Sequence, residues 1–135
     1  MRRKELEQLV LQMENYLECW KQFNHFINLA RAKNFSAEDE NQFLEIKSVL
    51  TQQLEMLLTS LAGGGTTREE IHGLIGGAPS LRYLSEQNEN ELRTLENQWH
   101  KIFITWQSLL GQLKVKQREM EGQGFLASLF GRKKS

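Results

Sequence analysis

Apolar residues recur at steps of three and four along the first part of the chain. They are Leu6, Leu9, Met13, Tyr16, Trp20, Phe23, Ile27 and Ala30. This spacing places side chains on one face of an α-helix. Val10 and Leu17 widen that face, which is typical of a helix that packs against two neighbours rather than one. The pattern therefore predicts a long amphipathic helix over residues 2–34.

Capping chemistry indicates that a second helix begins soon afterwards. The hydroxyl of Ser36 can accept a hydrogen bond from the backbone amide of Asp39, and the acids at 38–40 suit the positive end of a helix dipole. Apolar positions then continue at helical spacing with Phe43, Ile46, Leu50, Leu54, Leu57 and Leu61. Three glycines at 63–65 end the pattern. We expect a helix over about 37–62, antiparallel to the first because the connection is only a few residues long.

The segment 62–79 has a different composition. It holds six of the chain's ten glycines and its only proline, which is typical of a hinge. Within it, Ile71, Leu74 and Ile75 form a small apolar face. The sequence predicts a short helix over about 68–75 that covers the end of the helical hairpin.

The longest apolar stripe follows Ser80. Its members are Leu81, Leu84, Leu92, Leu95, Trp99, Ile102, Trp106, Leu109, Leu113 and Met120. The stripe predicts one helix over about 80–121, which Gly122 and Gly124 end. A helix of this length spans roughly 60 Å, against about 50 Å for the first helix and under about 40 Å for the second. We therefore expect the last helix to extend beyond its neighbours.

These elements together predict an all-α fold. The expected arrangement is an antiparallel three-helix bundle of long, coiled-coil-like helices over residues 1–121. A short extra helix lies in the glycine-rich connection, and an apolar and basic C-terminal tail covers 122–135. In an up-down-up order of three long helices, the first and last residues fall at opposite ends of the bundle.

Length and charge fit a single small domain. The chain has 135 residues, of which 17 are basic and 17 acidic, so it lacks the positive excess that binds nucleic acid, and we expect no nucleic-acid partner. Bases at 2–4 and 132–134 leave an acidic body between them. The single cysteine, Cys19, can form no internal disulfide, and no apolar run is long enough to span a bilayer. These features favour a cytoplasmic protein.

Candidate catalytic and metal-binding residues do not converge in the sequence. Cys19 needs a nearby base to act as a nucleophile, and His25 falls on another side of the same helix. Glu69 and His72 have the spacing of a di-iron ligand pair, but the chain has no second pair of this kind. The glycines at 63–65 precede a helix, as in a phosphate-binding loop, but lack its Gly-Lys-Ser/Thr ending. We therefore predict no enzyme activity, no cofactor and no metal site.

The end of the chain is the strongest candidate for a binding site. It combines apolar and basic residues, namely Phe125, Leu126, Leu129, Phe130, Arg132, Lys133 and Lys134. Three interpretations are open: the tail folds back onto the bundle, it lies on an anionic membrane surface, or it docks into a groove of another protein. Since the basic clusters at the two chain ends are expected at opposite ends of the bundle, they would not share one membrane footprint. This favours protein docking.

The leading hypothesis is a non-enzymatic cytoplasmic adaptor or scaffold that binds an unidentified protein through its tail. The long helix, glycine hinge and short helix also resemble small all-helical export chaperones of the flagellar type. That resemblance implies an open apolar face that binds an amphipathic client helix. A peripheral membrane protein with the tail as a weak surface anchor is the third hypothesis. A homodimer is also compatible with the sequence, because Leu109, Leu113 and Met120 lie on the expected overhang of the last helix.

Overall fold

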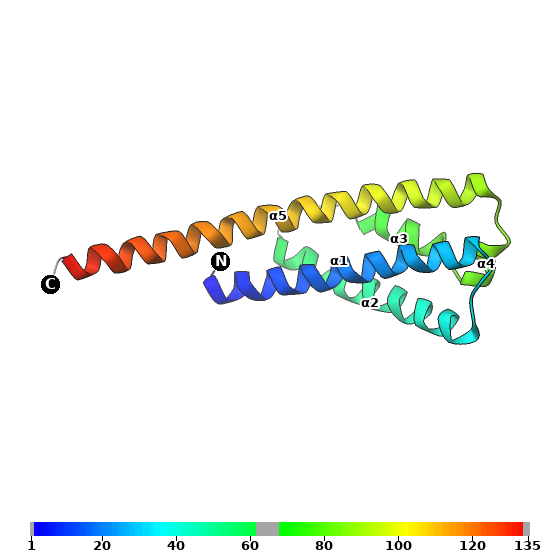
Figure 1. Cartoon of the computed structure of the whole chain (residues 1–135), viewed down its shortest axis with the longest axis horizontal. Coiled ribbons are helices and arrows are strands. Elements are labelled where there is room, and N and C mark those ends of the chain that lie inside the picture. The colour runs from blue at the N-terminus through cyan, green and yellow to red at the C-terminus, as the bar shows by residue number, and fades with distance from the viewer. Residues whose placement is uncertain (1, 62–67, 134–135) are drawn as a thin grey trace.

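The described part of the chain contains helices and connections and no strand. The computed structural model describes residues 2–61 and 68–133, with side chains described as far as Gln123. The helices are α1 (Arg3–Arg31), α2 (Ala37–Leu61), α3 (Arg68–Gly76), α4 (Leu81–Ser85) and α5 (Glu89–Lys133) (Figure 1). The prediction of an all-α fold is confirmed.

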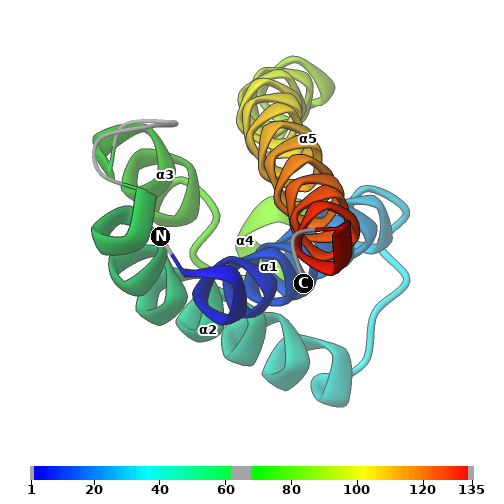
Figure 2. The same ribbon diagram turned by 90° about the vertical axis from the view of Figure 1, so that its left-hand side faces the viewer.

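Helix α1 lies at the centre of the arrangement. It packs against α5, α2 and α4, while α3 contacts both α5 and α2. Viewed along the length of the molecule, α2 and α5 lie on different sides of α1 (Figure 2). The apolar face of α1 is broad because two long helices cover it.

The helices α2 and α5 both run antiparallel to α1 (Figure 1). This follows from α3, which carries the chain back from the end of α2 toward α4. The expectation that the first and last residues fall at opposite ends of the molecule is therefore wrong. The start of α1 and the end of α5 point to the same end, because the segment expected only to cover the hairpin makes an additional pass along it.

The helix expected over 80–121 is divided into α4 and α5. The chain leaves helical geometry between Ser85 and Glu89. Asn88 caps α5, since its side-chain oxygen accepts a hydrogen bond from the backbone N–H of Glu91 at 2.9 Å. The stripe alone did not reveal this break.

The C-terminal boundary of the last helix also differs from the expectation. Helix α5 continues past Gly122 to Lys133 instead of ending at 121. A glycine inside a helix costs only about 1 kcal/mol relative to alanine, so it does not end the helix by itself. The segment expected as a glycine-tethered tail is thus helical backbone as far as Lys133.

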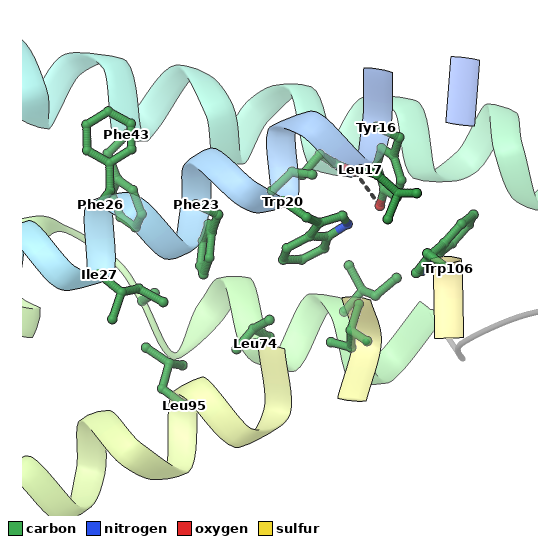
Figure 3. Packing of buried hydrophobic residues seen from close by; sticks show 14 of the residues in the cluster. Tyr16, Leu17, Trp20, Phe23, Phe26, Ile27, Phe43, Leu74, Leu95 and Trp106 are labelled. Carbon is green, nitrogen blue, oxygen red and sulfur yellow. Dashed lines mark hydrogen bonds between the residues drawn. The ribbon is translucent and has the colours of Figure 1, made fainter. Parts of the chain in front are cut away.

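The core is built around aromatic residues of α1 (Figure 3). Tyr16, Trp20 and Phe23 are fully buried. The ring of Tyr16 lies 5.0 Å from that of Trp106 of α5, and the ring of Phe23 lies 5.3 Å from that of Phe43 of α2. Aromatic contacts of this kind contribute about 0.5–1.5 kcal/mol each beyond burial. The same row of rings therefore joins α1 to both α2 and α5.

Two sets of hydrogen bonds fix the first turn of α2. The backbone N–H of Ser36 donates to Oδ2 of Asp39 at 2.8 Å, and the backbone N–H of Asp39 donates to the hydroxyl of Ser36 at 3.1 Å, as the capping motif predicts. In the same turn the carboxylate of Glu40 accepts from the backbone N–H groups of Leu81 at 2.7 Å and Arg82 at 3.3 Å. The start of α2 therefore also holds the start of α4 in place.

Candidate functional site: the projecting end of α5

Helix α5 is longer than the helix it packs against. Its register on α1 is set by the indole N–H of Trp99, which donates to the backbone oxygen of Trp20 at 2.7 Å. Because the two helices are antiparallel, Arg3 at the start of α1 lies level with about residue 116 of α5. Residues 118–133, which we call the projection, therefore extend beyond α1 (Figure 1). At a rise of about 1.5 Å per residue the projection is about 24 Å long.

The inner face of α5 is occupied by the body of the molecule. Ile102 and Trp106 are buried, and Leu109 and Leu113 are half-buried against the same core. Met120 is half-buried at the start of the projection. Leu109 and Leu113, which the sequence offers as self-association residues, are therefore engaged within the chain.

The opposite face of α5 is open to solvent. Ile104 and Val115 are 48% and 52% exposed. The space beside Gly111 and Gly122, where a Cβ atom would lie, is empty to 4 Å. In sequence order these four positions are seven, four and seven residues apart, so they share one face of the helix. We call this the outer face of α5.

The predicted docking residues lie in the last part of the projection. Phe125, Leu126, Leu129, Phe130, Arg132 and Lys133 belong to the helical backbone of α5 but their side chains lie outside the described residues, and Lys134 lies outside them entirely. In helical register, positions 126 and 129 follow Gly122 by four and seven residues and continue the outer face. Within the described ranges, none of the helices combines the length and apolar character needed to cross a bilayer.

Basic residues from both ends of the sequence gather at this end of the molecule. They are Arg2, Arg3 and Lys4 at the start of α1, and Lys114, Lys116 and Arg118 on α5. Arg3 and Lys114 each pair with a glutamate of α1 at 3.5 Å. Both ion pairs are solvent-exposed, so each of them is weak. The same end also carries five acids, Glu5, Glu7, Glu14, Glu119 and Glu121, so most of its positive excess comes from the bases at 132–134.

The opposite end of the molecule is acidic. It carries Glu38, Asp39, Glu40, Glu45, Glu86, Glu89, Glu91 and Glu96, against Arg31, Lys33, Lys47, Arg82 and Arg93. The chain as a whole is formally neutral. Charge is therefore separated along the long axis, with the positive end at the projection and the negative end at the turn between α1 and α2.

Residues with catalytic or metal-binding chemistry are dispersed. Cys19 is half-buried on α1, and burial together with the charge of Glu18 raises its pKa, which disfavours the reactive thiolate. His25 on α1 and His72 on α3 are exposed. In the part of the chain that the structure describes, no group of three or more histidine, cysteine, aspartate or glutamate residues could hold a metal ion. The glycines at 63–65 lie outside the described residues.

Arg31 anchors the start of α5, a role that no local motif predicts. Its Nε lies 3.2 Å from Oε2 of Glu89, and its Nη1 donates to Oδ1 of Asn28 at 2.8 Å and also pairs with the carboxylate of Glu96. The hydrogen bond to Glu96 is the largest of the interactions that raise the Arg31 pKa. These contacts depend on how α5 sits against α1, which is a tertiary property.

The chain matches no protein-family model, no curated protein and no solved structure. Its candidate function therefore has to be inferred from the projection, the outer face of α5 and the separation of charge along the molecule.

Proposed function

We propose that the protein is a non-enzymatic helical adaptor that docks through the projection of α5. The observation that supports this most is that only part of α5 packs against the rest of the protein. Helix α5 is covered by the body as far as Leu113 and then extends about 24 Å beyond the start of α1. Of the described side chains of the projection, 118–123, all but that of Met120 are exposed, and the sequence of the projection ends in apolar and basic residues. A segment of this composition suits a binding element.

In this proposal α1, with α2 and α5 packed antiparallel to it on different sides, acts as a rigid body with coiled-coil-like stripes that carries the projection. The buried rings of Tyr16, Trp20 and Trp106 supply that rigidity. We propose a cytoplasmic location, with which the single cysteine, Cys19, is compatible. No cofactor or metal takes part in the proposed function.

An export chaperone fits the described surface less well. Such a protein presents a continuous apolar face to its client, whereas the large exposed apolar residues are distributed over α1, α2, α4 and α5. They are Leu11, Leu44, Met56, Tyr83, Ile104 and Val115. Ile104 and Val115 share the outer face of α5, and that face leads into the projection.

The test is a double substitution in the full-length protein. Leu126→Asp with Leu129→Asp introduces charge into the projection. The matched control is Leu44→Asp with Met56→Asp, which makes the same change at positions of α2 that are 45% and 59% exposed. Each protein is immobilised and exposed to an extract of its native cell that includes membranes, and the retained protein and lipid are measured.

We expect the variant in the projection to lose most of the retained material while its circular dichroism and thermal midpoint stay unchanged. The control in α2 should retain as much as the unmodified protein. Equal retention by all three proteins would contradict docking through the projection.

A further inference from the structure

We infer that the projection of α5 docks onto the surface of an anionic lipid bilayer. This inference rests on the proposed docking function and names the partner. The sequence favours a protein groove because the two terminal basic clusters are expected at opposite ends. In the structure the start of α1 and the end of α5 point to the same end of the molecule (Figure 1), so that objection to a membrane no longer applies.

The separation of charge along the molecule suits an anionic surface. Lys116 and Arg118 are exposed on α5 close to the level of the start of α1, where residues 2–4 add three further exposed bases. The far end carries an excess of acidic over basic residues. In the negative potential of an anionic membrane, this distribution turns the projection toward the lipid and the acidic end away from it. Each base held near the surface strengthens binding roughly fivefold.

The outer face of α5 supplies the apolar side of an interfacial helix. Ile104 and Val115 are about half exposed, and positions 126 and 129 continue the face into the projection. Arg118 follows Val115 by three residues and Glu119 follows it by four, so a base and an acid border this face on its two sides. Contact of this face with the lipid is limited to the projecting end, where positions 126 and 129 are leucine and the bases at 132–134 follow in the sequence.

The strength of this attachment depends on salt. A short apolar face with a few bases binds membranes reversibly. The bases act through solvent, where the screening length falls from about 10 Å at 0.1 M to about 3 Å at 1 M ionic strength. Binding should therefore weaken markedly at high salt, whereas a purely apolar attachment would not.

A second copy of the chain fits this end of the molecule less well. Two copies that meet through their projections bring the basic residues of both chains together. The outer face also has glycine at 111 and 122, so it offers little apolar area toward the roughly 1,600 Å² that a stable interface buries.

The experiment measures flotation of the full-length protein with two kinds of vesicle. One consists of phosphatidylcholine alone, and the other also contains phosphatidylglycerol at about a third of the lipid, which gives the anionic surface. The basic variant is Lys116→Gln with Arg118→Gln. Its matched control is Arg82→Gln with Arg93→Gln, which removes the same charge from two exposed positions at the acidic end. The apolar variant is Leu126→Asp with Leu129→Asp.

We expect the unmodified protein to float with the anionic vesicles at low salt and to bind neutral vesicles at least tenfold less tightly. The basic variant should bind the anionic vesicles roughly 25-fold less tightly because two bases are lost. The control should bind them at least as tightly as the unmodified protein. The apolar variant should not float.

Three results would overturn the inference in different ways. Equal binding to both kinds of vesicle would remove the role of anionic lipid. Absence of flotation, combined with loss of retention by the apolar variant in the extract experiment, would leave the docking function standing and assign the projection to a protein. Sedimentation velocity would then show whether that protein is a second copy. Absence of both effects would overturn the docking function together with the inference.

Discussion

The two halves of α5 have the same secondary structure and different surroundings. In the first half Trp99 donates a hydrogen bond to the backbone of Trp20, and Ile102 and Trp106 are buried. In the second half, from about residue 116 onward, α5 continues beyond the start of α1 (Figure 1). The comparison teaches that the periodicity of the sequence locates the apolar face of a helix. The lengths of the neighbouring helices decide how much of that face is buried.

The largest expected effect on stability comes from a substitution of Trp106, in the half of α5 that packs against α1. This residue is fully buried, with its ring 5.0 Å from that of Tyr16. Trp106→Ala should lower the free energy of unfolding by about 3–5 kcal/mol, because it removes a large buried side chain and leaves a cavity. Urea unfolding followed by circular dichroism measures the change.

Two controls sharpen the interpretation of that loss. Val115→Ala on the outer face should change the free energy of unfolding by less than about 0.5 kcal/mol, since Val115 is 52% exposed. Trp106→Phe should cost less than Trp106→Ala, because it leaves a smaller cavity and removes an indole N–H that has no acceptor among the described residues. Similar losses for Trp106→Ala and Val115→Ala would contradict the division of α5 into covered and open faces.

The pH dependence of unfolding tests whether Tyr16, which packs against the first half of α5, is buried in the core. Burial raises the Tyr16 pKa well above its usual range, and its hydroxyl donates to the backbone oxygen of Leu50 at 3.3 Å (Figure 3). Above about pH 10 the unfolded chain loses the phenolic proton while the folded chain keeps it. The free energy of unfolding should therefore fall with rising pH, by up to about 1.4 kcal/mol per pH unit.

Tyr16→Phe isolates this contribution. Its free energy of unfolding should fall less steeply above pH 10, as measured by urea titrations at a series of pH values. Burial also raises the Cys19 pKa, but Cys19 is present in both proteins, so its effect cancels in the comparison. Parallel slopes for the two proteins would show that Tyr16 is not buried as described.

A smaller effect is expected where α5 begins, at Arg31. Arg31→Met keeps most of the side-chain stem but removes the contacts to Asn28, Glu89 and Glu96. Hydrogen bonds to charged groups contribute about 1.5–3 kcal/mol when buried, but this side chain is 28% exposed, so we expect a loss of about 1 kcal/mol. Arg82→Met, in which an 84% exposed side chain loses its pairing with Glu86, should be neutral. Equal effects in urea unfolding would argue against the anchoring role of Arg31.

The positions of the long helices follow from local patterns in the sequence. The stripe of α1 and the capping pair Ser36 and Asp39 place α1 and the start of α2 close to their observed bounds. The break before α5 also had a signal, because no large apolar residue occurs between Leu84 and Leu92, and Asn88 stands three residues before a glutamate. The helix expected over 80–121 was too long because the apolar stripe was taken as continuous across the gap between Leu84 and Leu92.

The direction of α5 and the site at its end could not be obtained from such patterns. A short helix such as α3 gives the same local signal whether it covers the end of a hairpin or carries the chain back along it. Contacts such as that between Glu40 and the backbone of Leu81 join residues 41 positions apart and have no periodicity. That the start of α1 and the end of α5 point to the same end of the molecule depends on that direction, so only the fold reveals it.

The smallest expected effect on stability comes from removing the end of α5 that extends beyond α1. A chain ending at Gln123 lacks the part of the projection that lies farthest from α1, and its urea unfolding midpoint should shift by less than about 0.5 kcal/mol in equivalent free energy. A chain ending at Ser108 is the control, because it also loses Leu109 and Leu113, which are half-buried against the core, and it should be destabilised by about 2 kcal/mol or more. A large loss in the chain ending at Gln123 would mean that the last residues belong to the core, and the reason for assigning them to an external partner would disappear.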